Sequence, residues 1–239
     1  MARDQFIENK ATGPEHLLSP RFAPANIRDR MQQVFDPPVT ALNEWVLALR
    51  EDPRLPPGAG QTIPFFDPRG GGVEAKVLFL MQDPSEVATF TGFISPDNND
   101  PSANNSTIAC ERAGLAPRDR VHWNIFPWWV NVTKGGKPVD PTRPPQSYAA
   151  AQPLAVRLLR DFLGMLPELR VIVLLGNHAQ QGFDRLGVSR SLTGRGITVL
   201  RGPSTSPQSW NNVDKSDPKL RRRSDIAIEK LTEAARLIR

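Results

Sequence analysis

Cysteine is almost absent from this chain of 239 residues, in which Cys110 stands alone. A lone cysteine excludes an internal disulfide, a Cys-rich zinc site and a cysteine-ligated iron–sulfur cluster. We expect Cys110 to be a small buried residue on a helix. The sequence therefore predicts a protein that uses no metal.

Nucleotide-binding loops are missing as well. No Gly-x-Gly-x-x-Gly or Walker-type motif follows any apolar run of the chain. The glycine run 70–72 lacks the Lys-Ser/Thr pair and the helix of a phosphate-binding loop, so it is predicted to be a turn. The sequence thus predicts no cofactor of any kind.

Long apolar runs are also absent. No segment approaches the run of about 18 apolar residues that a membrane span requires. The first residues, from Met1 to Gln5, lack the apolar core of a secretory signal. We therefore expect a cytoplasmic protein that has no membrane partner.

Charge of both signs is plentiful, with a modest excess of positive charge. The chain has 30 Lys and Arg residues against 25 Asp and Glu residues, a net charge of +5 and a pI near 9.8. This balance suits a polyanionic partner without requiring one. The run Arg221 to Arg223 is either a phosphate contact or a solvated cluster before a helix.

The length and the turn-forming residues favour one large domain with long loops. The chain is long enough for one well-buried core and short for two. Its 24 prolines and 17 glycines must lie mostly between regular elements. We expect residues 1–239 to form a single domain, in which residues 1–37 are an irregular extension packed on the surface.

Apolar runs and helical patterns alternate along the chain. Four short runs rich in Val, Ile, Leu or Phe predict buried strands at 76–81, 121–126, 171–176 and 197–201. Amphipathic patterns predict helices at 38–50, 105–113, 146–166, 178–186 and after Ser224. This alternation predicts an α/β fold with three αβα layers, whose central four-stranded, mainly parallel sheet has helices on both faces.

Polar residues follow each predicted strand, where parallel sheets bind their ligands. The segments are Gln82-Asp83-Pro84, Asn124 with Phe126-Pro127-Trp128-Trp129, Gly176-Asn177-His178 and the loop 202–207. Each alone is ordinary turn chemistry. Together, a Gln-Asp-Pro motif, a strand Asn, a Leu-Leu-Gly-x-x-Ala-Gln segment and a Pro-x-x-Ser-Pro loop resemble the uracil-DNA glycosylase superfamily, in its branch without an iron–sulfur cluster, over residues 77–212.

The resemblance implies a monofunctional DNA-repair glycosylase of base excision repair, which flips uracil out of DNA and leaves an abasic site. In that family, the residue matching Asp83 positions the attacking water, and the residue matching Asn124 reads the base. The backbone around Gln82 would donate to a uracil carbonyl. Phe93 is the closest match to the aromatic that stacks on the base, with Phe90 second; either could instead belong to the core.

The resemblance also implies the DNA contacts. The family inserts a wedge from the loop after the fourth strand, which here contains Ser206, Pro207, Gln208 and Trp210. Trp210 is either that wedge or a residue packed beneath the loop. The expected partner is single- or double-stranded DNA that contains uracil, and the expected form is a monomer that is associated with the nucleoid when on DNA.

The family pattern breaks at one catalytic position. Where the family usually has a His that stabilises the departing base, this chain has Ser204. Loss of such a donor costs about 10²–10³ in rate. The alternative function is therefore a protein that binds uracil or abasic DNA with weak or no turnover. His178 is a helix start, a phosphate contact or a replacement donor, and His122 lines the pocket or lies in the core.

Overall fold

The computed structural model describes residues 13–185, 187, 192 and 194–239. At its centre lie four parallel strands in the order β4-β2-β7-β8. Their bounds are β2 Val77–Met81, β4 Arg120–Asn124, β7 Val171–Leu175 and β8 Thr198–Gly202. The predicted four-stranded α/β fold is confirmed, and every pairing in this sheet is parallel.

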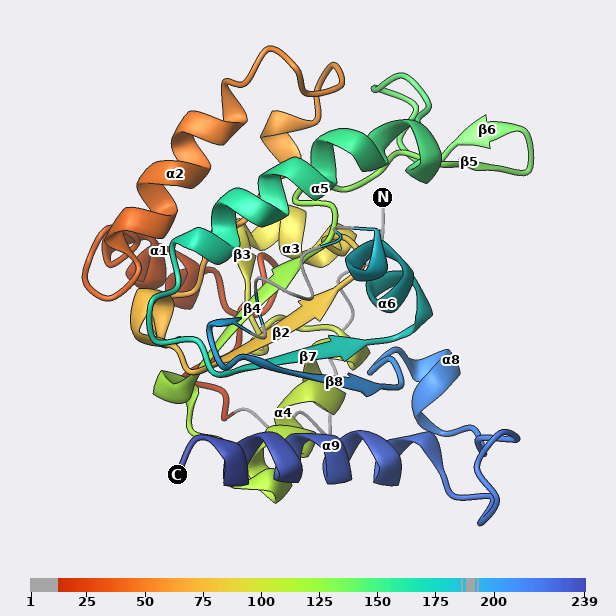
Figure 1. Cartoon of the computed structure of the whole chain (residues 1–239). Helices are drawn as coiled ribbons and strands as arrows, with labels where there is room; N and C mark the ends of the chain where they lie inside the picture. Colours follow the sequence, from red (N-terminus) through yellow and green to blue (C-terminus); the bar gives the residue numbers. More distant parts are fainter. Residues whose placement is uncertain (1–12, 186, 188–191, 193) are drawn as a thin grey trace.

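Helices cover both faces of the sheet, which gives three layers (Figure 1). One face packs against α2 (Thr40–Arg50), α5 (Tyr148–Gly164) and α6 (Asn177–Asp184). The other packs against α4 (Pro101–Ala113) and α9 (Arg223–Leu237). Because successive strand residues point to opposite faces, Leu78 and Leu80 enter the first core, while Val77 and Phe79 enter the second.

Short elements surround these layers. The parallel pair β1 (Phe65–Phe66) and β3 (Phe93–Ile94) was not predicted, and neither was the antiparallel hairpin of β5 (Thr133–Lys134) and β6 (Lys137–Pro138). Two further short helices are α3 (Glu86–Thr91) and α8 (Pro207–Trp210), and single 3₁₀ turns lie at Gly60–Thr62, Gly72–Glu74 and Pro117–Asp119. α3 begins after Ser85, whose Oγ accepts a hydrogen bond from the Ala88 N–H at 3.1 Å.

The N-terminal region is more regular than its sequence predicts. Within residues 1–37, which we expected to be irregular, Pro24–Gln32 form helix α1, so the prediction is wrong there. Arg30 of this helix is buried and forms ion pairs with Asp67 and Asp97. These long-range pairs hold a helix that has little apolar periodicity of its own. Residues 1–12 lie outside the described part.

The register of the sheet aligns the carboxyl ends of its strands. Met81 of β2 is opposite Asn124 of β4, and Leu175 of β7 is opposite Gly202 of β8. The loops that follow these strands therefore start at one edge, the edge at which a parallel sheet binds ligands. Among the described residues, no helix has the length and apolar character needed to span a membrane.

Candidate active site

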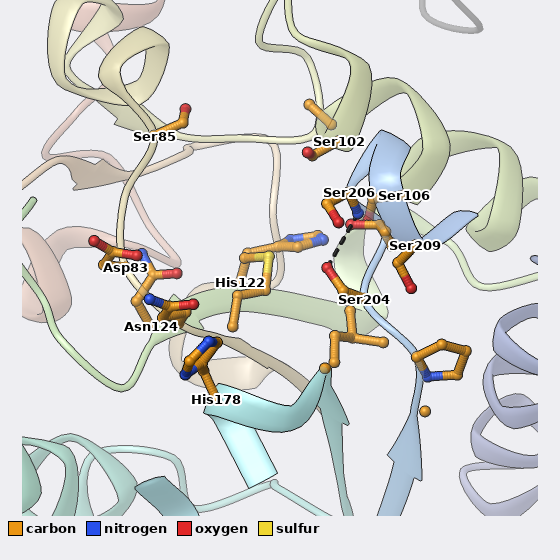
Figure 2. Close-up of a pocket in the computed structure, with 18 of the residues that line it drawn as sticks. Asp83, Ser85, Ser102, Ser106, His122, Asn124, His178, Ser204, Ser206 and Ser209 are labelled. Atoms are coloured by element: carbon orange, nitrogen blue, oxygen red, sulfur yellow. Dashed lines mark hydrogen bonds between the residues drawn. The ribbon is translucent and has the colours of Figure 1, made fainter. Parts of the chain in front are cut away.

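A pocket of about 680 Å³ opens at the carboxyl edge of the sheet. All four strand-end segments contribute to its wall, including Gln82, Asp83, Asn124, Ser204 and Ser206. Figure 2 shows Asp83 and Asn124 on one side of this pocket and a group of serines on the other, with the ring of His122 between them. The structure thus brings together most of the residues that the sequence placed at strand ends.

Asp83 is held in the wall by two hydrogen bonds to one carboxylate oxygen. The Tyr148 hydroxyl donates to Oδ2 at 3.1 Å, and the Val130 N–H approaches the same atom at 3.4 Å. No hydrogen bond to Oδ1 is found within the described residues. One oxygen is therefore fixed by the protein, while the other remains available to a water molecule or a ligand.

Burial makes Asp83 unusually basic for a carboxylate. Removal from water disfavours its charged form and raises the pKa of Asp83 to about 7, although the hydrogen bonds from Tyr148 and Val130 act in the opposite direction. Near neutral pH the carboxyl group therefore exchanges readily between its two protonation states. A group of this kind can both accept and release a proton.

Tyr148 is a site residue that the sequence argument missed. It is the first residue of α5, a helix capped by Ser147, whose Oγ accepts a hydrogen bond from the Ala150 N–H at 3.2 Å. Its ring stacks on His178, with centroids 6.1 Å apart. Tyr148 begins a helix and does not follow a strand. It therefore lies outside the strand-end segments in which the sequence predicts ligand-binding residues.

Replacing Tyr148 with phenylalanine is expected to raise the pKa of Asp83 above its value of about 7 in the parent protein. The Tyr148 hydroxyl stabilises the ionised carboxylate and so lowers the pKa of Asp83. Without this hydroxyl, the rise in pKa that burial causes is opposed less strongly. Carbon-13 NMR of labelled aspartate across the pH range measures this change. An unchanged or lower pKa would show that the hydrogen bond does not tune Asp83.

Asn124 ends β4 inside the pocket wall. Its side chain is 2 % exposed, and its Nδ2 finds no hydrogen-bond partner among the described residues. A buried donor without a partner costs about 1–3 kcal/mol, which a ligand can recover by accepting its hydrogen bond. A carboxamide also offers a donor and an acceptor side by side, which is the pattern needed to read a base edge.

The loop after β8 approaches the end of β7 very closely. Gly176 has a φ of 94°, and a Cβ at this position would lie 2.9 Å from Cβ of Ser204. Only glycine satisfies both demands. The close approach places Ser204 in the pocket wall, where its Oγ accepts a hydrogen bond from the Ser206 N–H at 3.1 Å.

Gln82 enters the site chiefly through its position in the wall. Its carbonyl oxygen already accepts a hydrogen bond from the Phe126 N–H at 2.9 Å. The segment that follows β2 is thus fixed to the segment that follows β4. The expected donation from the Gln82 backbone to a ligand stays a prediction.

The structure does not bring Phe93 to the pocket. Phe93 is fully buried in β3, where it is opposite Phe65, and it belongs to the core beside α2 and α5. Phe90 is 56 % exposed on α3 and does not line the pocket either. Ile94, the residue after Phe93, does line the pocket, together with other aliphatic side chains such as Leu175 and Ile226.

Trp210 also differs from the expectation of a wedge. It is 9 % exposed and packs in the core between the sheet, α4 and α9. Pro207 and Gln208, at the start of α8, are exposed, whereas Ser206 lines the pocket. Of the four predicted DNA contacts, three therefore remain on accessible surface, and of the two roles expected for Trp210 the structure supports the packed residue and not the wedge.

The arginine run before α9 is largely engaged within the protein. Arg221 forms ion pairs with Asp217 and Glu229, and Arg223 lies 3.6 Å from Asp214. These pairs hold Arg221 within the protein, whereas Arg222 is exposed and Arg223 lines the pocket, so a phosphate contact by this run stays a prediction. Within the described part of the chain, no group of three or more His, Cys, Asp or Glu side chains could hold a metal ion.

Comparison of the chain with models of known protein families finds no match, and comparison with curated proteins finds no significant match. Function is therefore inferred from the residues of the pocket and from the motif resemblance of the sequence.

Proposed function

We propose that this protein is a DNA glycosylase that hydrolyses the N-glycosidic bond of uracil in DNA. The observation that supports this most strongly is the pairing of two groups in one pocket. Asp83 presents a partly buried carboxylate whose Oδ1 accepts no hydrogen bond from the described residues, and Asn124 presents a buried carboxamide whose Nδ2 has no partner among them. The first suits water activation, and the second suits recognition of a base edge.

The proposed reaction uses these groups and one water molecule. The water oxygen bonds to the sugar carbon C1′, while the bond from C1′ to the base nitrogen breaks and leaves its electron pair on the base. Asp83 accepts the proton of the water and stabilises the positive charge that develops on the sugar. Tyr148 and Val130 keep the carboxylate oriented throughout.

Positive charge on a projecting hairpin also suits a DNA partner. The hairpin of β5 and β6 projects from the molecule at the end to which the strands of the sheet point (Figure 1). Its exposed tip places Lys134 directly opposite Lys137 across the Gly135-Gly136 turn. Like charges that face each other destabilise a hairpin, and a phosphate backbone nearby would relieve their repulsion.

Incubation with an end-labelled duplex that contains one U·G pair, followed by alkali, tests the proposal. Strand cleavage at the uracil is the expected result, and the same duplex with a C·G pair should remain intact. The U·G pair is chosen because a mismatched base is the least costly to flip. Absence of both cleavage and specific binding would overturn the proposal.

A second candidate is a protein that binds uracil or abasic DNA without efficient turnover. It is favoured by Ser204, whose short hydroxyl stands where the resembled family usually places a histidine donor and whose Oγ accepts a hydrogen bond from the Ser206 N–H. The same labelled duplex separates the two candidates. A stable complex that survives with an intact strand after alkali indicates binding alone.

Replacing Ser204 with histidine is expected to raise the single-turnover excision rate by about tenfold or more, since an added donor stabilises the departing base. Quench-flow or manual sampling with enzyme in excess measures this rate. Ser209→His, at another residue of the same wall, is the matched control and should give no gain. An unchanged rate in Ser204→His would show either that this side chain does not face the leaving base or that another donor of the pocket already serves it.

A further inference from the structure

His122 is a buried histidine of the pocket wall, separate from the groups that activate the water and read the base edge. It lies two residues before Asn124 on β4, so both side chains project from the same face of the strand. The residue is 8 % exposed and lines the pocket. In Figure 2 its ring lies between the pair Asp83 and Asn124 and the serine wall that contains Ser204.

The imidazole lacks the partners that a structural histidine would have. Its Nε2 is buried and has no hydrogen-bond partner within the described part of the chain, and its closest ring neighbour is the edge-on Phe79 at 4.9 Å. Rotation about the terminal side-chain bond can present either ring nitrogen to the pocket. Buried polar groups are normally satisfied, so an unsatisfied one points to a ligand.

The surroundings also keep this imidazole neutral. Burial, together with the positive charge of Arg120 on the same face of β4, lowers the pKa of His122 to about 3. A neutral imidazole donates from one nitrogen without bringing a cation into a buried site. It can therefore stabilise a base that departs with a negative charge and remain unprotonated throughout the reaction.

We propose that His122 is a catalytic residue that donates a hydrogen bond to a carbonyl oxygen of the departing base, an inference that rests on the proposed glycosylase function. His122 and Asn124 lie on one strand face, and each has a side-chain nitrogen without a hydrogen-bond partner among the described residues, so both then contact the same base. The donor is thus supplied from β4. Ser204, with its hydroxyl turned to the Ser206 N–H, is not needed in that role.

His178 is the rival donor, because it also lines the pocket. It is exposed at the start of α6, and its ring stacks on Tyr148, which already serves Asp83. That position suits support of the Tyr148 ring. His122 differs from His178 because it is buried and its Nε2 has no hydrogen-bond partner among the described residues. A ligand in the pocket can supply that partner.

Single-turnover excision from the U·G duplex tests the inference with four variants. His122→Leu is expected to lower the rate by about 10²-fold, while its thermal midpoint stays equal or rises because no partner is lost. His122→Gln keeps a donor and should recover at least about a tenth of the rate. His178→Leu should lose less than about tenfold, and the remote His16→Leu should match the parent.

The double variant His122→Leu with Ser204→His tests whether His122 donates to the departing base, as the loop histidine of the resembled family does. If it does, Ser204→His should accelerate the His122→Leu protein by a larger factor than it accelerates the parent, since one donor replaces the other. Equal factors in the two backgrounds, or a His122→Leu rate within about twofold of the parent, would overturn the inference while the glycosylase function stands.

A binding readout that does not depend on turnover completes the test. The chain has only three histidines, so nitrogen-15 histidine NMR resolves each ring. Addition of free uracil is expected to shift the His122 ring signals and to leave those of His16 unchanged. No shift of His122 in a protein that excises uracil would overturn this inference; absence of excision and of DNA binding in the parent would overturn the proposed function itself.

Discussion

Asp83→Asn is expected to lower the single-turnover rate of uracil excision by about 10³- to 10⁴-fold while the affinity for uracil-containing DNA changes by no more than about threefold. An asparagine at this position can still accept hydrogen bonds from Tyr148 and Val130, so the loop keeps its arrangement. It cannot accept the proton of the attacking water. Excision kinetics and a fluorescence-anisotropy titration measure the two quantities.

Asp36→Asn is the matched control for this variant, because Asp36 is exposed and does not line the pocket. It makes the same chemical change and should leave both quantities unaltered. Turnover near that of the parent in Asp83→Asn would contradict the water-activating role. A large loss of affinity would instead indicate that the carboxylate organises the DNA-binding surface.

Asp83→Asn also has a predictable effect on the stability of the fold. Because the pKa of Asp83 is raised from 3.8 to about 7, the unfolded chain binds fewer protons at this residue than the folded chain between these two pH values. Asp83 therefore makes the parent less stable as the pH rises through that window. The thermal midpoint of Asp83→Asn should exceed that of the parent by a margin that grows from pH 4 to pH 7 and then levels off.

Asn124→Leu is expected to lower the excision rate by about 10³-fold. Two polar groups of the base edge would lose their partners at the buried Asn124, and each such loss costs about 2 kcal/mol. The protein itself should become more stable, because the change removes a buried Nδ2 that has no partner within the described residues. Excision kinetics and thermal unfolding at one pH measure the opposed effects.

Asn43→Leu provides the matched contrast in the core. Asn43 is fully buried like Asn124, but its amide donates to the carbonyl oxygens of Val34 and Phe66 and accepts from the Phe66 N–H. Its replacement should lower the thermal midpoint, because three backbone groups lose their partner. If both variants were destabilised alike, Asn124 would be a structural residue and not a recognition residue.

The sheet could be predicted from the sequence because each strand is a short apolar run with its own turn signals. The run predicted at 76–81 corresponds to β2, and the runs at 171–176 and 197–201 correspond to β7 and β8 within a residue or two. The same topology places Asp83, Asn124 and Ser204 at one edge, so their proximity also follows from the sequence. Local patterns sufficed for these features.

Other features depend on contacts between distant residues, which no local pattern contains. In the sequence, Phe93 resembles a stacking aromatic, but in the structure it is buried by pairing with β1. Trp210 resembles a wedge, but in the structure it packs against α9. The partner of Asp83 comes from a helix that begins 65 residues later in the chain. The sequence therefore predicts two things poorly. One is which aromatic residues are buried, and the other is which distant residue forms a hydrogen bond with Asp83.

The hydroxyl that donates to Asp83 belongs to the only tyrosine of the chain. Burial and the neighbouring carboxylate raise the pKa of Tyr148 above its ordinary value. Every phenol signal in an absorbance, fluorescence or vibrational spectrum of this protein therefore originates beside the proposed water-activating group. The molecule thus contains an intrinsic optical probe, through which the charge and occupancy of the pocket can be followed without a label.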